Sequence, residues 1–156
     1  MSNEYYTPSK YVESARKVMG SIDLDPASNE IANIIVKAKK YYSKENNGLN
    51  KPWYDNVFLN PPYSREEIKL FTDKLIEEIE NDHVYQCIML VNSSTSTNWF
   101  HKLLQYCSFG CIVKGRINFY TVEGKTKGNR YDSMFLYFGN YGSEFQEEFR
   151  QYGFIF

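Results

Sequence analysis

The sequence has few of the residues that enzymes use for metal or covalent chemistry. Its 156 residues include two histidines, far apart, and three cysteines, Cys87, Cys107 and Cys111. Cys107 and Cys111 have no further partner at the spacing of a zinc site, and no cysteine shows a local nucleophile signature, so we expect no metal. An odd number of cysteines argues against a disulfide framework and for reduced thiols in the cytoplasm.

Long apolar runs and targeting signals are missing as well. The longest runs, such as Cys87–Val91, are far shorter than the ~20 residues that cross a bilayer. Met1–Tyr6 has neither of the regions that define a signal peptide, so we expect no membrane association. Repeats and low-complexity tracts are absent, and the length fits a single domain over residues 1–156.

Two nucleotide-binding signatures are absent. No two glycines stand two residues apart, which excludes the G-x-G-x-x-G fingerprint of dinucleotide-binding proteins. Gly124-Lys125-Thr126 resembles the end of a P-loop, but Phe119 occupies the position of its first glycine. Neither a dehydrogenase nor an NTPase is therefore indicated.

The net charge of −1 hides an uneven distribution. Basic residues outnumber acidic ones by four in residues 31–52 and by five in residues 101–130, whereas residues 64–85 carry an acidic excess of four. Segregated positive charge suits phosphate contacts, although two solvated lysine-rich surfaces on unrelated faces would give the same count.

Helical and strand patterns alternate along the chain. Helices are expected over residues 8–19, from residue 29, and over 65–79, 97–106 and 145–152; strands are expected at 22–24, 57–59, 84–91, 111–120 and 133–138. Thr7 with Pro8 predicts the N-cap of the first helix and Gly20 its end, and Ser64-x-x-Glu67 is a capping box. This alternation predicts an α/β sheet that finishes in an antiparallel strand pair.

Two polar segments follow expected strands directly. They are Asp25-Pro26-Ala27-Ser28 and Asn60-Pro61-Pro62-Tyr63. Ligands of α/β sheets bind beyond the carboxyl ends of strands, so both segments are expected at the same crevice.

Asn60–Tyr63 suits the binding of an exocyclic amine. Two prolines fix the backbone, so the Asn60 carboxamide and the carbonyl after it face outward as acceptors, and Tyr63 adds a stacking face. Such a set holds the amine hydrogens, aims the lone pair and fixes the plane of the substrate. The alternative is an ordinary turn, since Asn-Pro and Pro-Pro are common there.

Asn60–Tyr63 matches the catalytic motif of the amino-methyltransferases. Further blocks resemble, in order and spacing, the phage-type (Dam-like) DNA N6-adenine methyltransferases, over most of the chain; they are Tyr5–Pro8, Ile22–Ser28, Gly48–Trp53, Asn92–Trp99 and Gly115–Phe119. The resemblance implies a Rossmann-like methyltransferase sheet, S-adenosylmethionine as cofactor, and double-stranded DNA with a flipped adenine as substrate. It also implies a phage origin, with the host cytoplasm as location and protection of DNA from restriction as role.

The resemblance also assigns residues. The catalytic positions are Asn60, Pro61, Pro62 and Tyr63; the positions for the cofactor are Tyr6, Thr7, Pro8, Asp25, Pro26, Ser28, Glu45 and Trp53. Thr7 and Pro8 would meet the methionine part of the cofactor, Asp25 its amino group and Glu45 its ribose. DNA would be contacted by Lys114 and Arg116 and by Lys125, Lys127 and Arg130 of the short basic loop Thr121–Asp132.

Other interpretations stay open. Asp25 could simply cap a helix, Trp53 could belong to the core, Arg116 could pair with a carboxylate, and the tyrosine pairs could serve packing. The 25–28 block lacks the glycine of many methyltransferases. A catalytically degenerate fold that binds nucleic acid or a partner, or an enzyme acting on RNA or protein, remains an alternative, and the oligomeric state cannot be read.

Overall fold

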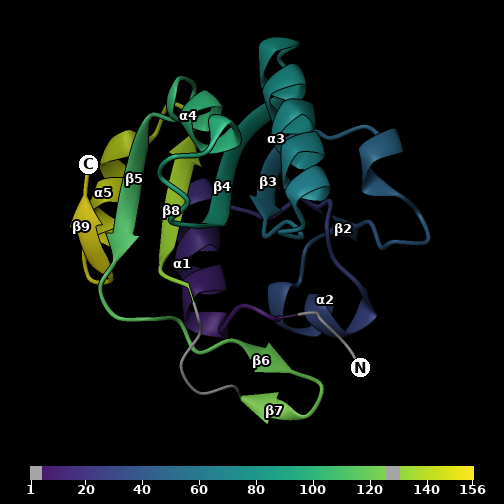
Figure 1. Cartoon of the computed structure of the whole chain (residues 1–156), viewed down its shortest axis with the longest axis horizontal. Coiled ribbons are helices and arrows are strands. Elements are labelled where there is room, and N and C mark those ends of the chain that lie inside the picture. The colour runs from purple at the N-terminus through teal and green to yellow at the C-terminus, as the bar shows by residue number, and fades with distance from the viewer. Residues whose placement is uncertain (1–4, 126–130) are drawn as a thin grey trace.

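The computed structural model describes residues 5–125 and 131–156, with the side chain of residue 125 left out, and builds them around a seven-stranded sheet (Figure 1). The strands lie in the order β2-β1-β3-β4-β8-β5-β9. They are β1 (Leu24–Asp25), β2 (Lys40–Tyr41), β3 (Asp55–Leu59), β4 (Val84–Asn92), β5 (Phe109–Val113), β8 (Ser133–Phe138) and β9 (Gly153–Ile155). A separate two-stranded hairpin is formed by β6 (Tyr120–Thr121) and β7 (Gly124–Lys125).

Helices cover both faces of the sheet. They are α1 (Ser9–Met19), α2 (Glu30–Val36), α3 (Arg65–Glu80), α4 (Asn98–Leu104) and α5 (Gly142–Phe149), and a 3₁₀ turn, η1, spans Gly48–Asn50. Figure 1 shows α3 and α4 in front of the sheet and α1 behind it. The hairpin lies at the edge of the sheet where α1 begins.

The strand directions change across the sheet. β2, β1, β3 and β4 are parallel neighbours, β8 runs antiparallel to both β4 and β5, and β9 runs antiparallel to β5. From the central pair β1 and β3, the chain crosses by α2 outward to β2 and by α3 in the opposite direction to β4. The order of strands therefore reverses between β1 and β3, the place where α/β sheets form a ligand crevice.

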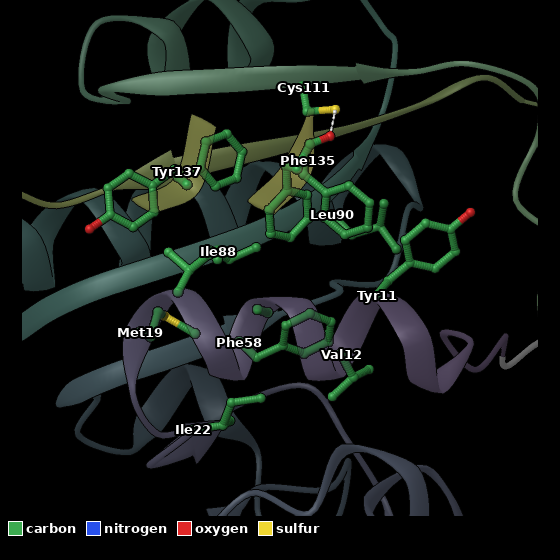
Figure 2. Close-up of a cluster of buried hydrophobic side chains, with 14 of the residues drawn as sticks. Tyr11, Val12, Met19, Ile22, Phe58, Ile88, Leu90, Cys111, Phe135 and Tyr137 are labelled. Carbon is green, nitrogen blue, oxygen red and sulfur yellow. Dashed lines mark hydrogen bonds between the residues drawn. The ribbon is translucent and has the colours of Figure 1, made fainter. Parts of the chain in front are cut away.

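Each face of the sheet has its own hydrophobic core. On one face, Tyr11, Val12 and Met19 of α1 pack on Phe58, Ile88, Leu90 and Phe135, and the Cys111 thiol donates to the Phe149 carbonyl (Figure 2). On the other face, α3 and α4 cover a cluster that includes Trp53, Leu59, Leu75 and Met89. Both cores are anchored on strands β3 and β4, so the carboxyl ends of these strands are held on a rigid base.

The expected α/β fold with a Rossmann-like sheet and antiparallel end is confirmed. Helix α3 begins at the expected capping box, where Ser64 Oγ accepts from the Glu67 amide at 3.2 Å, and Gly20 ends α1 with φ = 88°. The expected strand over 111–120 is wrong, because β5 ends at Val113 and the chain then leaves the sheet. The last helix ends at Phe149 rather than 152, and the sequence did not indicate β9.

Candidate active site

The carboxyl ends of β1 and β3 bring the two polar segments to the same edge of the sheet. Leu24 pairs in parallel with Val57, so Asp25 at the end of β1 and Asn60 just beyond β3 leave the sheet side by side. This register places both segments at the same end of the sheet, and that they line one crevice stays a prediction. The helices that follow the two strands, α2 and α3, cover opposite faces of the sheet.

Asn60 is partly exposed, and its amide group is held on both sides. Asn60 Nδ2 donates to Thr7 Oγ1 at 3.3 Å and lies 3.5 Å from the Tyr5 carbonyl oxygen. Asn60 Oδ1 lies 3.3 Å from the Tyr63 hydroxyl. Pro61, the next residue, is buried, which fixes the backbone beyond the strand, and Pro62 is partly exposed.

Tyr63 combines a buried hydroxyl with a partly exposed ring. The hydroxyl donates to the Leu90 carbonyl on β4, and its burial raises the pKa of Tyr63. The ring packs against the core under α3. Tyr63 is thus fixed at its tip, and its ring stands beside Asn60 in a defined orientation.

Thr7 does not cap α1, which corrects the sequence-based expectation. The helix begins at Ser9 with Pro8 as N-cap, and no side chain bonds to its first amides. The Thr7 side chain is buried, with 4% of the residue exposed, and its hydroxyl accepts from Asn60 instead. The Thr7 hydroxyl therefore serves Asn60, and the first amides of α1 have no side-chain cap.

Tyr6, which precedes Thr7, ties the N-terminal segment to the hairpin. Its backbone exchanges two hydrogen bonds with Tyr120 of β6, with N···O distances of 2.7 and 2.9 Å. The Tyr6 side chain is buried. The hairpin, the segment Tyr5–Pro8 and Asn60 therefore form one connected group.

Asp25 is a buried carboxylate, with 3% of the residue exposed. Burial raises its pKa from 3.8 to about 7, although the Ala27 amide, 3.2 Å from Oδ1, and the Ser28 hydroxyl lower it in part. None of the ion pairs among the described residues includes Asp25. A carboxylate in this environment has a strong electrostatic preference for a cationic ligand.

The loop after Asp25 packs against the segment that follows β2. Pro26 and Ser28 are both buried, and the Ser28 amide donates to the Tyr42 carbonyl at 2.8 Å. A Cβ atom on Gly48 would lie 2.2 Å from the Pro26 carbonyl oxygen, so only glycine fits there. The 25–28 block has no glycine of its own, but Gly48, from a different part of the chain, leaves room for its backbone.

Two of the expected cofactor residues differ in exposure, since Glu45 lies at the surface and Trp53 in the core. Glu45 is exposed in the turn that follows β2, on the side of the sheet to which β1 also leads. Trp53 has no exposed surface, and its indole N–H donates to the Gly48 carbonyl at 2.9 Å. The ring of Trp53 therefore offers no face to a ligand in this conformation and supports the core below the loop.

Comparison with known proteins decides the family. The family model described as DNA N-6-adenine-methyltransferase (Dam) matches residues 2–148. The chain belongs to this Dam family. One Dam relative is the "DNA N-6-adenine-methyltransferase" of Escherichia phage T1, which is 38% identical over 101 residues. The match covers 64% of this chain and 40% of the relative, so the chain spans about two fifths of the relative's length.

The basic residues expected at a Dam-family DNA interface are only partly described. Lys114 and Arg116 are exposed in the segment after β5, and Arg116 Nε lies 3.2 Å from Asp132 Oδ1. Lys125 lies on β7, where its backbone pairs with Tyr120. The expected positions Lys127 and Arg130 lie outside the described residues.

Sequence reasoning missed two backbone groups of this candidate site. They are the Tyr5 carbonyl, near the Asn60 amide, and the Leu90 carbonyl, which accepts from Tyr63. Backbone acceptors leave no signal in a sequence.

Cavities of about 290 and 360 Å³ lie by Lys17 and Glu144, away from every expected site residue. We assign these cavities no role in the proposed chemistry.

The described residues contain no group of three or more histidine, cysteine, aspartate or glutamate side chains that could hold a metal ion. No helix among them is long and apolar enough to cross a membrane.

Proposed function

We propose that the protein transfers a methyl group from S-adenosylmethionine to the N6 amine of adenine in DNA. Membership of the Dam family supports this reaction class. The observation that carries the proposal is the partly exposed Asn60 amide, whose nitrogen donates to Thr7 Oγ1 and whose oxygen lies beside the Tyr63 hydroxyl with capacity for a further hydrogen bond.

The chain would hold the target amine by hydrogen bonds and stacking. Asn60 Oδ1 and the Pro61 carbonyl accept the two amine hydrogens, which aims the nitrogen lone pair away from both acceptors. The Tyr63 ring, fixed through its hydroxyl, sets the plane of the adenine. These groups act by orienting the substrate, and none of them forms a covalent bond to it.

Asp25 fits the cationic amino group of the cofactor. It is buried and lacks a cationic partner among the described residues, so an ammonium group would offset the cost of ionising it. S-adenosylmethionine supplies an activated methyl group on a sulfonium centre when it is bound. The buried loop Pro26–Ser28 would line the cofactor, and exposed Glu45 would accept hydrogen bonds from its ribose.

DNA would reach the site along the basic segments. An amine inside a duplex cannot meet Asn60, so the adenine must leave the base stack, and that costs a few kcal/mol. Phosphate contacts by exposed Lys114 and Arg116 and by the hairpin would offset this cost. The exposed ion pair of Arg116 with Asp132 is worth about 1 kcal/mol or less and can be exchanged for a phosphate.

A methyl-transfer assay tests the proposal. Purified protein and labelled S-adenosylmethionine are offered unmethylated DNA, RNA and protein acceptors side by side. We expect label in DNA, on N6 of adenine, and a loss of about a hundredfold or more in Asn60→Ala, the usual effect of removing a preorganised polar group. Asn50→Ala, an exposed asparagine on η1, is the matched control.

Label in RNA or protein alone would replace the substrate assignment. Cofactor binding without transfer to any acceptor would identify a binding module instead of an enzyme. Full activity of Asn60→Ala would refute the proposed role of the crevice.

A further inference from the structure

The orientation of the Asn60 amide decides whether the residue accepts or donates at the open side of the crevice. The amide carries an oxygen that only accepts and a nitrogen with two hydrogens that only donates. A flip by 180° would present the nitrogen to the substrate amine, and two donors would then face each other. An enzyme that binds an amine here must keep the oxygen outward.

The contacts of Asn60 favour one orientation. Nδ2 lies 3.5 Å from the carbonyl oxygen of Tyr5, an atom that can only accept, and 3.3 Å from Thr7 Oγ1. Flipping the amide would place two oxygens against each other at Tyr5. The Tyr63 hydroxyl has a single hydrogen, which the Leu90 carbonyl takes, so Oδ1 keeps acceptor capacity for a substrate.

Thr7 is well suited to fix this orientation. It is buried and β-branched, so its χ1 angle is restricted. Its hydroxyl makes no capping bond, since α1 starts at Ser9 without a side-chain cap. The backbone beside it is held by the two hydrogen bonds between Tyr6 and Tyr120.

We infer that Thr7 is a positioning residue for the transfer reaction. Its hydroxyl, together with the Tyr5 carbonyl, takes both hydrogens of the Asn60 amide and thereby presents Oδ1 to the target amine. The inference rests on the proposed function, and it gives Thr7 a task distinct from cofactor contact. It also places the orientation of Asn60 under the control of the hairpin through Tyr6.

Two substitutions separate positioning from cofactor binding. Thr7→Val keeps the shape of the side chain and removes the hydroxyl, while Thr7→Ser keeps the hydroxyl. For Thr7→Val we expect kcat to fall about five- to tenfold, which corresponds to the loss of one hydrogen bond, with the Kd for S-adenosylmethionine unchanged. Thr7→Ser should restore most of the rate.

A second measurement does not depend on activity. The side-chain amide signals of Asn60 in a ¹⁵N–¹H spectrum, identified by their loss in Asn60→Ala, should move in Thr7→Val and stay near the wild-type position in Thr7→Ser. Unmoved signals in a folded Thr7→Val protein would overturn the inference. So would a higher Kd for S-adenosylmethionine with unchanged kcat, which would assign Thr7 to the cofactor.

Failure of the proposed function is recognised separately. It would appear as absence of methyl transfer by the wild-type protein, while the spectrum would still decide whether Thr7 orients Asn60.

Discussion

The buried carboxylate of Asp25 makes a quantitative prediction about stability. Its pKa of about 7 in the folded protein lies about three units above the 3.8 of an unfolded chain, because burial penalises the charged form. Each unit corresponds to about 1.4 kcal/mol, so ionised Asp25 should destabilise the ligand-free protein by about 4 kcal/mol. Screening does not reduce this figure much, since only 3% of the residue is exposed.

The direction of the pH dependence follows from the raised pKa. Between about pH 4 and pH 7 the folded state holds a proton on Asp25 that the unfolded state has released. The contribution of this residue to the free energy of unfolding should therefore fall as the pH rises through that window, and its full cost should be present above pH 7. Asp25→Asn keeps the acceptor for the Ala27 amide and has no proton to lose.

Urea unfolding of both proteins from pH 4 to pH 8 measures this effect. The two should be similar near pH 4, and Asp25→Asn should be more stable by up to about 4 kcal/mol at pH 8. The same variant should lose affinity for S-adenosylmethionine, whereas the wild-type Kd should rise about tenfold for each pH unit below 7. A stability difference that stays constant over this range would refute the reasoning.

Two more substitutions test the surroundings of the site. Tyr63→Phe keeps the ring but removes the hydrogen bond to the Leu90 carbonyl. We therefore expect the free energy of unfolding to fall by about 1 kcal/mol and the transfer rate to fall less than tenfold. A loss of rate as large as that of Tyr63→Ala would contradict a stacking role for the ring. Gly48→Ala should cost about 1–3 kcal/mol and weaken cofactor binding, because its Cβ would push the Pro26 carbonyl away. Asn50→Ala in the same turn is the control, and equal stability of these two variants in urea would show that the loop yields freely.

Local signals predicted much of the fold. The capping box at Ser64 and the left-handed glycine at position 20 act within a few residues, and both form as expected. The run of residues 87–91 is apolar and buried throughout, as suits a strand that is covered on both faces, and it lies in β4 at the centre of the sheet. The convergence of Asp25 and Asn60 could be predicted because it needs only parallel strands and the rule for their carboxyl ends.

The remaining features could not be predicted, because they depend on contacts between residues that are far apart in the sequence. Thr7 has the local pattern of an N-cap, yet its hydroxyl meets Asn60, which is 53 residues away in the sequence. Strand β9 is only three residues long, and it forms because it pairs with β5. No local sequence pattern indicates that pairing. Trp53 looks like a candidate ligand contact in the sequence, and only the tertiary structure shows that its indole is used to hold Gly48.

The pairing of Tyr6 with Tyr120 also has a consequence for the order of assembly. The segment that holds the Asn60 amide is made early during translation, but its strand partner on β6 is made much later. A nascent chain can therefore build α1 and the β1–β4 half of the sheet while the amide at position 60 is still free to rotate. Competence for catalysis should then arise only after β6 has been made and has paired with Tyr6.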